Sequence, residues 1–258
     1  MTESTWPSWL PLRENLSELS PYGAPQVESD AALNTNENPF SLPQELIDAI
    51  AKEISRVSSS LNRYPDRDAL ALRSALAAYI NGESSTSFTS DHIWAANGSN
   101  EVIQSLFLAC GSQGAMGFVP SYSMHPLIAR VTSTNWIDAK RESDLSLDMD
   151  HAIKQIKEDP QGLTFITSPN NPTGEALTIG EIEIIAQQVS GLLVVDEAYS
   201  EFSDEVSAVT LISKYPHLVV IRTMSKAFAF AGARVGYLVA HPSVIQAMML
   251  VRLPYHLS

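Results

Sequence analysis

The pattern of apolar and polar positions changes at about residue 92. From there on, short continuous apolar runs alternate with segments of helical spacing such as 179–189. This alternation predicts an α/β fold built from βαβ units, with a mostly parallel central sheet and helices on both of its faces. A further strand is expected near 130–132, and VGYLVA at 235–240 is expected to return antiparallel. The runs that read as buried strands are IWAA at 93–96, AMGFV at 115–119, LTFIT at 163–167, LLVV at 192–195 and HLVVI at 217–221.

The chain before residue 92 is organised differently. Residues 1–40 are rich in proline and polar residues and predict an extended arm, which contains a turn in PYGAP at 21–25 and a polar loop, LNTNENPF, at 33–40. A helix is predicted from Ser41 as its cap, with Pro43 in the first turn. Its apolar residues share one face, which we expect to be buried: Leu46, Ile47, Ile50, Ile54 and Val57. The main domain is expected to cover residues 41–251.

Composition narrows the class of protein. A chain of 258 residues with 45% hydrophobic and 17% charged residues can bury a large core. The net charge of -13 argues against nucleic-acid partners, which require a basic surface. No apolar run reaches the roughly 18 residues of a membrane span, and the N-terminus lacks the pattern of a secretory signal. Because Cys110 is the only cysteine, disulfides and cysteine metal sites are excluded, no metal is expected, and a cytoplasmic location is predicted.

The segment 222–237, RTMSKAFAFAGARVGY, carries the strongest chemical signal. It follows the apolar run at 217–221 and places Thr223, Ser225, Lys226 and then Arg234 after the end of a predicted strand. Ligands of open α/β sheets bind beyond the carboxyl ends of the strands, so these side chains indicate an anion site with a nucleophile. A lysine there can form a Schiff base if its surroundings lower its pKa. On this segment alone, a surface lysine beside a small-residue turn is an equally good interpretation.

Other loops after predicted strands also carry polar groups. Gly98, Ser99 and Asn100 open a helix whose free N–H groups could hold a phosphate, although a plain helix cap would have the same sequence. Tyr122 could stack on a ring or be a packing residue. Further along the chain, Asn171 lies in a strong turn, NNPTG, and Tyr199 follows three residues after an acidic one.

The acidic residue is Asp196, which ends a nearly all-apolar strand. A buried carboxylate needs a cation or a protonated nitrogen nearby. Together with the groups above, it completes the set that pyridoxal phosphate requires: a phosphate cradle, a stacking ring, an amide, a carboxylate, a phenol and a lysine. The chain contains neither G-x-x-x-x-G-K-[ST] nor a G-x-G-x-x-G after the first strand, which excludes two competing phosphate sites.

With these motifs in place, the chain resembles the fold-type I aminotransferases of class I and II. The matching segments run from residue 22 to residue 237 and are PYGAP, LNTNENPF, LNRYPD, NGSNE, PSYSMH, SPNNPTG, VVDEAYSEF and TMSKAFAFAGARVGY. The resemblance implies the large domain of that fold. It also implies that a small C-terminal domain is missing, and residues 252–258 would begin the connection to it. The arginine that binds the substrate carboxylate in this family would be lost with that domain.

The resemblance also implies a role for each matching residue. Lys226 would form the Schiff base with pyridoxal 5'-phosphate and move the proton, with Asp196 on the ring nitrogen and Tyr199 on the 3'-oxygen as the other catalytic residues. Asn171 would also bind the 3'-oxygen, and Tyr122 would stack on the ring. Tyr22 and Asn36 would contact substrate. The phosphate would be held by Gly98, Ser99, Asn100, Thr223, Ser225 and Arg234, with Tyr64 reaching in from the partner of a homodimer.

Three of these segments together resemble those of the branch of the family that acts on L-histidinol phosphate: LNTNENPF, RYPD and PSYSMH. The implied reaction transfers its amino group to 2-oxoglutarate, giving imidazole-acetol phosphate and glutamate, a step of histidine biosynthesis. Turnover is expected to be impaired if the small domain is missing. The alternatives are an aromatic aminotransferase, a lyase similar to threonine-phosphate decarboxylase, and a fragment that binds the cofactor without catalysis.

Overall fold

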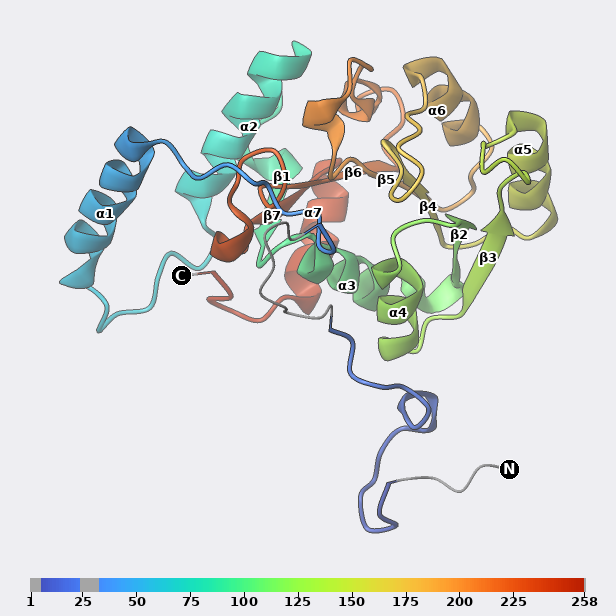
Figure 1. The fold of residues 1–258 in the computed structure, drawn as a ribbon, viewed down its shortest axis with the longest axis horizontal. Coiled ribbons are helices and arrows are strands. Elements are labelled where there is room, and N and C mark those ends of the chain that lie inside the picture. Colours follow the sequence, from blue (N-terminus) through green and yellow to red (C-terminus); the bar gives the residue numbers. More distant parts are fainter. Residues whose placement is uncertain (1–5, 24–32, 258) are drawn as a thin grey trace.

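A seven-stranded sheet with helices on both faces forms the body of the protein in a computed structural model, which describes residues 6–23 and 33–257 (Figure 1). The strand order is β1-β7-β6-β5-β4-β2-β3. β2 to β6 run parallel, whereas β7 lies between β1 and β6 and is antiparallel to both. The strands are β1 (Ile93–Ala96), β2 (Ala115–Val119), β3 (Trp136–Lys140), β4 (Leu163–Thr167), β5 (Leu192–Asp196), β6 (Leu218–Thr223) and β7 (Gly236–Val239). The predicted fold class and the antiparallel return are confirmed.

Two hydrophobic cores lie on opposite faces of the sheet because side chains alternate along each strand. Within β5, for example, Leu193 and Val195 belong to one core and Val194 to the other. The first core is covered by α2 (Leu70–Ser84), α5 (Met149–Glu158) and α6 (Ile179–Ala186). The second core is covered by α3 (Ser99–Cys110), α4 (Met124–Val131) and α7 (Pro242–Val251). Burial on both faces explains why the strands read as unbroken apolar runs.

Short 3-10 helices connect several of these elements. η4 and η5 follow β5, and η6 precedes β7, so they shape the loops at the carboxyl edge of the sheet. They are η1 (Glu14–Leu16), η2 (Ser90–His92), η3 (Gly111–Gln113), η4 (Ser200–Phe202), η5 (Ala208–Leu211) and η6 (Ala231–Ala233). Within the described residues, no helix combines the length and the apolarity that crossing a bilayer requires.

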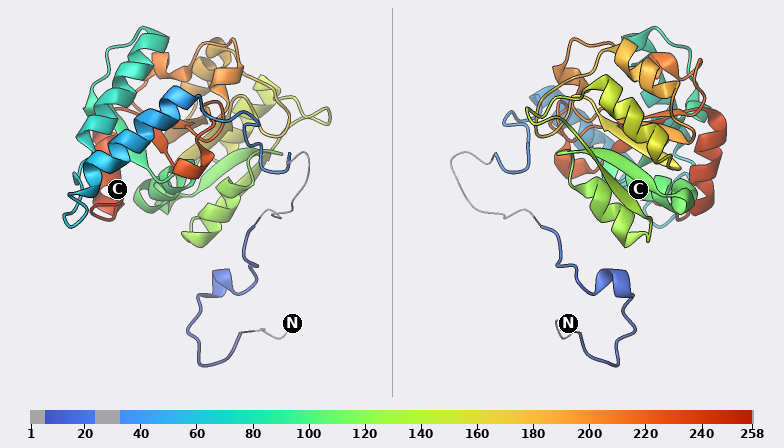
Figure 2. Two further views of the ribbon diagram at one scale, coloured as in Figure 1. Left: turned by 60° about the vertical axis from the view of Figure 1, so that its left-hand side comes forward. Right: turned by 90° about the vertical axis from the view of Figure 1, so that its right-hand side faces the viewer.

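Residues 6–23 form an arm that projects from the body (Figure 2), although Tyr22 near its end reaches the pocket. The segment is attached at the C-terminal end of α4, where Arg13 donates to the carbonyl of Val131 at 2.8 Å and Asn15 donates to that of Arg130 at 2.5 Å. These bonds satisfy carbonyl groups that a helix end leaves free. Residues 24 and 25 of the expected PYGAP turn lie outside the described residues.

The expectations for α1 (Gln44–Ser58) are wrong in two respects. Ser41 is not its cap: the helix begins three residues later and Pro43 occupies the capping position, with no side-chain cap. Its apolar face is not buried by the part of the chain that the structure describes, and α1 has no buried residue. Helical spacing reports which side chains share a face, but it does not report whether anything packs against that face.

The strand expected near 130–132 is also wrong, because these residues end α4 and the strand β3 begins at Trp136. The β-branched Val131 and Thr132 favoured a strand locally. In the structure, the Thr132 hydroxyl donates to the carbonyl of Ile128 at 2.9 Å, one turn back, and this bond closes the end of the helix.

Candidate functional site

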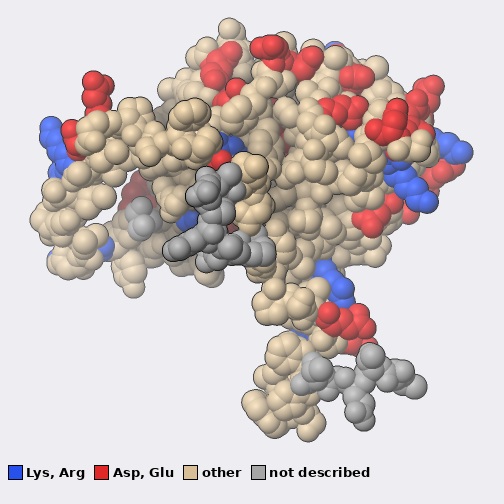
Figure 3. All heavy atoms as spheres, viewed as in Figure 1, with Lys and Arg blue, Asp and Glu red and all other residues tan. Residues whose placement is uncertain are grey.

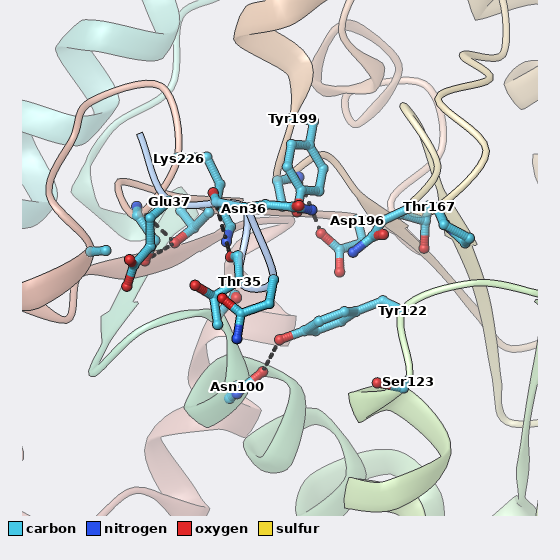
Figure 4. Close-up of a pocket in the computed structure, with 18 of the residues that line it drawn as sticks. Thr35, Asn36, Glu37, Asn100, Tyr122, Ser123, Thr167, Asp196, Tyr199 and Lys226 are labelled. Atoms are coloured by element: carbon cyan, nitrogen blue, oxygen red, sulfur yellow. Dashed lines mark hydrogen bonds between the residues drawn. The ribbon is translucent and has the colours of Figure 1, made fainter. Parts of the chain in front are cut away.

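Twelve of the fourteen predicted site residues line one pocket of about 1250 Å³ at the carboxyl edge of the sheet (Figure 4). The pocket is lined from the loops that follow β1, β2, β4, β5 and β6, and from the segment before α1. The predicted residues in its lining are Tyr22, Asn36, Ser99, Asn100, Tyr122, Asn171, Asp196, Tyr199, Thr223, Ser225, Lys226 and Arg234.

Lys226 is the half-buried nucleophile candidate. Its Nζ donates to the carbonyl of Thr35 at 2.8 Å and to that of Asn36 at 3.3 Å, and it lies 5.9 Å from the centre of the Tyr199 ring. Burial lowers the pKa of this amine, and the nearby Arg234 lowers it further, whereas Glu37 opposes the shift. A lowered pKa makes the neutral, nucleophilic form of a lysine accessible.

The loop that carries Lys226 is held in place by Asn38. The Nδ2 of Asn38 donates to the carbonyls of Lys226 and Ala227, each at 3.2 Å, while its Oδ1 accepts from the N–H of Phe40. Asn36, two residues earlier, donates from Nδ2 to the hydroxyl of Tyr199 at 2.9 Å. The segment before α1 is therefore bound to two pocket loops, a role for Asn38 that the sequence reading missed.

Asp196 ends β5 and is 2% exposed. Its Oδ1 accepts from the N–H of Ala198 at 3.1 Å, and its Oδ2 lies 3.0 Å from Nε2 of His125. His125, in the first turn of α4, is 1% exposed, and its ring lies 4.7 Å from that of Phe165. The sequence predicted that Asp196 needs a nitrogen partner but did not identify His125, although this histidine lies only three residues after Tyr122.

Tyr122 lies between His125 and the start of α3. Its hydroxyl donates to Oδ1 of Asn100 at 3.1 Å, and its ring meets the His125 ring edge-on, with 5.4 Å between centroids. Burial raises the pKa of Tyr122 to about 12, so the phenol stays protonated and remains a hydrogen-bond donor at neutral pH. The ring is thereby fixed from two sides.

A cradle for an anion lies at the N-terminus of α3. Gly98, at the capping position with φ 85°, leaves room for Arg234, because a Cβ there would stand 2.3 Å from Nη2 of that arginine. A Cβ on Gly236 would stand 2.3 Å from the backbone nitrogen of Ser99. Both glycines thus let β7 and a guanidinium approach free N–H groups, which is the donor set that a phosphate requires. Gly98 supports this cradle without lining the pocket itself.

The hydroxyl groups of the cradle come from the loop after β6. Thr223 donates from Oγ1 to Oγ of Ser225 at 3.0 Å, and the N–H of Ser225 points back to Oγ1 of Thr223 at 3.2 Å. Arg234 has φ 56° and donates from Nη1 to the carbonyl of Ala231 at 3.1 Å. The groups present at this edge of the pocket fit a phosphate monoester.

Asn171 faces the pocket because its neighbour fixes the loop. Asn170 is 3% exposed and donates to the carbonyl of Pro120 at 3.2 Å and to Oγ1 of Thr173 at 2.9 Å, while its Oδ1 accepts from Ser121. This buried amide determines the direction in which the next residue points.

Tyr64 is not brought to this pocket. It is 80% exposed, and its ring stacks on that of Tyr255 with 4.6 Å between centroids. Of the residues predicted to contact the cofactor, Tyr64 therefore lies apart from the others, on the loop between α1 and α2.

Comparison with known proteins agrees with this geometry. The family model for aminotransferase class I and II matches residues 30–258. The histidinol-phosphate aminotransferase of Nocardia farcinica (strain IFM 10152) is 54% identical over 252 residues, which cover 96% of this chain and 66% of the relative. That of Mycolicibacterium vanbaalenii is 53% identical, with 96% and 69% covered. The chain thus spans about two thirds of the length of these curated relatives.

Solved structures share the fold. The histidinol-phosphate aminotransferase of Sinorhizobium meliloti in complex with pyridoxal-5'-phosphate matches with a TM-score of 0.74 and 21% identity, covering 87% of this chain and 60% of that one. A Thermus thermophilus aspartate aminotransferase variant matches with a TM-score of 0.77 and 23% identity, covering 93% and 65%. Since the family model covers most of the sequence and relatives are more than half identical to it, this chain belongs to the class I and II aminotransferase family.

Proposed function

We propose that this chain binds pyridoxal 5'-phosphate and transfers the amino group of L-histidinol phosphate to 2-oxoglutarate, giving imidazole-acetol phosphate and glutamate. One structural observation carries the proposal: Lys226 and Asp196, 30 residues apart in sequence, line the same pocket as the residues of the anion cradle. The choice of substrate is supported by relatives that are 53–54% identical and are named histidinol-phosphate aminotransferases.

Different pocket residues would bind different parts of the cofactor. The start of α3, the hydroxyls of Thr223 and Ser225, and Arg234 would hold its phosphate, while Asp196 would face its ring nitrogen. When bound, pyridoxal phosphate supplies an aldehyde that condenses with amines and a ring that draws electrons from the substrate Cα. Tyr122 would lie against the ring, and Asn171 and Tyr199 would bind its 3'-oxygen.

Lys226 would perform two tasks in this site. Its amine would anchor the cofactor, and after an amino substrate has replaced it, Nζ would accept the proton that leaves the substrate Cα. The lowered pKa of Lys226 serves both tasks, because only the neutral amine is a nucleophile or a base. Asp196, held by His125 and the N–H of Ala198, would remain oriented toward the ring nitrogen throughout.

A spectroscopic titration tests the proposal in steps. Adding pyridoxal phosphate should give a visible absorption band, and borohydride followed by peptide mapping should place the label on Lys226; the Lys226→Ala variant should show neither. Adding L-histidinol phosphate should then abolish the band in a single half-reaction, without any need for full turnover. Loss of the band with an aromatic amino acid but not with histidinol phosphate, or carbon dioxide release from phosphothreonine, would contradict the assigned substrate.

We further propose a homodimer in which Tyr64 contacts the phosphate bound by the partner. Its exposure and its absence from the pocket lining of its own chain support this arrangement, as does the exposed Leu61 on the same loop. Losing one hydrogen bond to a charged group would weaken cofactor binding by about tenfold in Tyr64→Phe.

Mixing two defective variants tests the dimer. In a hybrid of Tyr64→Phe and Lys226→Ala chains, an intact Tyr64 from the second chain would complete the site of the first. Cofactor affinity at half of the sites should then return to the wild-type value. If Tyr64 acts within its own chain, neither site of the hybrid is complete and the affinity should not recover.

A further inference from the structure

A buried ion pair lies directly behind the pocket, on the opposite face of the sheet. Arg222, the penultimate residue of β6, is 3% exposed and donates from Nε to Oε2 of Glu197 at 2.8 Å. Glu197 follows β5 and is also 3% exposed. Because side chains alternate along a strand, Arg222 and Glu197 lie on the face covered by α2 and α6, whereas their neighbours Thr223 and Asp196 face the pocket.

The guanidinium of Arg222 uses all of its nitrogens to join the turns that follow β5. Nη1 donates to Oε1 of Glu201 at 2.9 Å, in η4, and Nη2 donates to Oγ of Ser207 at 3.0 Å, just before η5. Glu197 completes the network, since its Oε1 accepts from the N–H of Ala208 and its Oε2 accepts from Ser207, each at 2.7 Å. Both members of the central pair are therefore satisfied by several partners.

The three charged residues of this network lie one or two positions in sequence from a residue of the pocket. Glu197 follows Asp196 directly, Arg222 precedes Thr223, and Glu201 comes two residues after Tyr199. The backbone ladder of β5 and β6 ends with the bond from the N–H of Glu197 to the carbonyl of Ile221 at 2.9 Å. Beyond that bond the segments that follow β5 and β6 separate, one leading to Tyr199 and the other to Lys226. The ion pair of Arg222 and Glu197 links the two segments where they separate.

We propose that Arg222 and Glu197 are positioning residues that set the separation between the carboxylate of Asp196 and the amine of Lys226. The energetic argument is that a buried ion pair adds little net stability, because the cost of removing two charges from water offsets most of their attraction. A guanidinium is nevertheless a rigid planar fork that fixes the directions of its partners. The role rests on the proposed function, since the separation matters only if both groups bind one cofactor.

The test removes both charges together. In the double variant Arg222→Met/Glu197→Gln, the glutamine can still accept from the N–H of Ala208, and no uncompensated charge is left at the central pair. Glu201 can become neutral, because burial already raises its pKa. Arg222→Lys is the second variant: it keeps the charge, but a single ammonium cannot replace three directed donors. The measurements are the dissociation constant for pyridoxal phosphate, the pH midpoint of the visible band and the thermal unfolding midpoint.

Arg73 supplies the matched control. It is another buried arginine, 5% exposed, and it donates to the carbonyls of Ile93 and Ser90, each at 2.8 Å, away from the pocket lining. Arg73→Met should lower the unfolding midpoint without changing the dissociation constant or the pH midpoint. Both Arg222 variants should raise the dissociation constant by about tenfold or more and shift the pH midpoint.

The outcomes separate this inference from the proposed function. If the wild-type chain gives no visible band with pyridoxal phosphate, the proposed function fails. If the wild-type chain binds the cofactor and the Arg222 variants change only the unfolding midpoint, as Arg73→Met does, the positioning role is overturned and the network is purely structural.

Discussion

At the scale of single residues, the carboxylate of Asp196 is held, among the described residues, by the side chain of His125 and the backbone N–H of Ala198. His125→Phe would keep the ring packing but remove the donor, leaving a buried carboxylate short of a partner. We expect a loss of about 1–3 kcal/mol in the free energy of unfolding, together with weaker cofactor binding. Urea denaturation and a cofactor titration measure the two effects. His125→Gln, whose amide can donate at a similar position, should recover part of both; equal losses in the two variants would contradict the role of the donor.

Lys226 gives a pH dependence whose sign follows from its environment. Burial lowers its pKa in the folded protein below the ordinary 10.5, so between these two values the unfolded chain binds more protons than the folded one. Stability therefore rises with pH across that window. The free energy of unfolding of the wild type should increase relative to Lys226→Met as the pH is raised from neutrality toward 10.5. A constant difference across this range would show that the pKa is not lowered.

The motifs predicted twelve of the residues that line the pocket, and ten of these end or follow strands whose ends meet at one edge of the sheet. They did not predict the contacts of these residues. His125 reaches Asp196 across 71 residues of sequence, and Asn38 reaches the Lys226 loop across 188. Such pairs depend on how α4 and the segment before α1 pack, and local sequence does not encode that packing.

At the scale of elements, α1 is the helix whose apolar face has no cover among the described residues. Leu46 is 45% exposed and Ile54 is 59% exposed. Replacing both with lysine should reduce the binding of an apolar dye, and it should change the free energy of unfolding by no more than about 0.5 kcal/mol for each site. Leu76→Ala is the contrast: this α2 residue is 6% exposed, and its truncation should cost about 2–5 kcal/mol. A comparable loss from the α1 changes would mean that its face is covered.

Six of the seven strands were predictable because they are buried and leave continuous apolar runs, whereas the partly exposed β3 was missed. The start of α1 and the identity of the C-terminal part of α4 were misread, since Ser41 and Val131 have local preferences that the tertiary structure overrides. Element type can be read where the periodicity is long, whereas caps and short helices are decided by neighbours that are distant in the sequence.

At the scale of the whole molecule, the negative net charge of the protein repels the proposed ligands, which are anions. The net charge is -13, and acidic side chains gather over the part of the surface near α5 and α6 (Figure 3). Because the Debye length falls from about 30 Å at 0.01 M salt to about 8 Å at 0.15 M, added salt should screen this repulsion while leaving contacts inside the pocket nearly intact. The association rate of pyridoxal phosphate should rise by about two- to threefold over that range. Stopped-flow absorbance measures it, and a falling rate would show that Lys226 and Arg234 dominate the field.

The position of β7 between β1 and β6 has a consequence for how the chain is made. β1 has β7 as its sheet neighbour, and β7 leaves the ribosome some 140 residues later. During most of synthesis β1 therefore has no strand paired to either edge, and the first turn of α3 cannot yet pack against Gly236. A chain that ended before residue 236 would contain all five parallel strands, β2 to β6, but would still lack the phosphate end of its pocket.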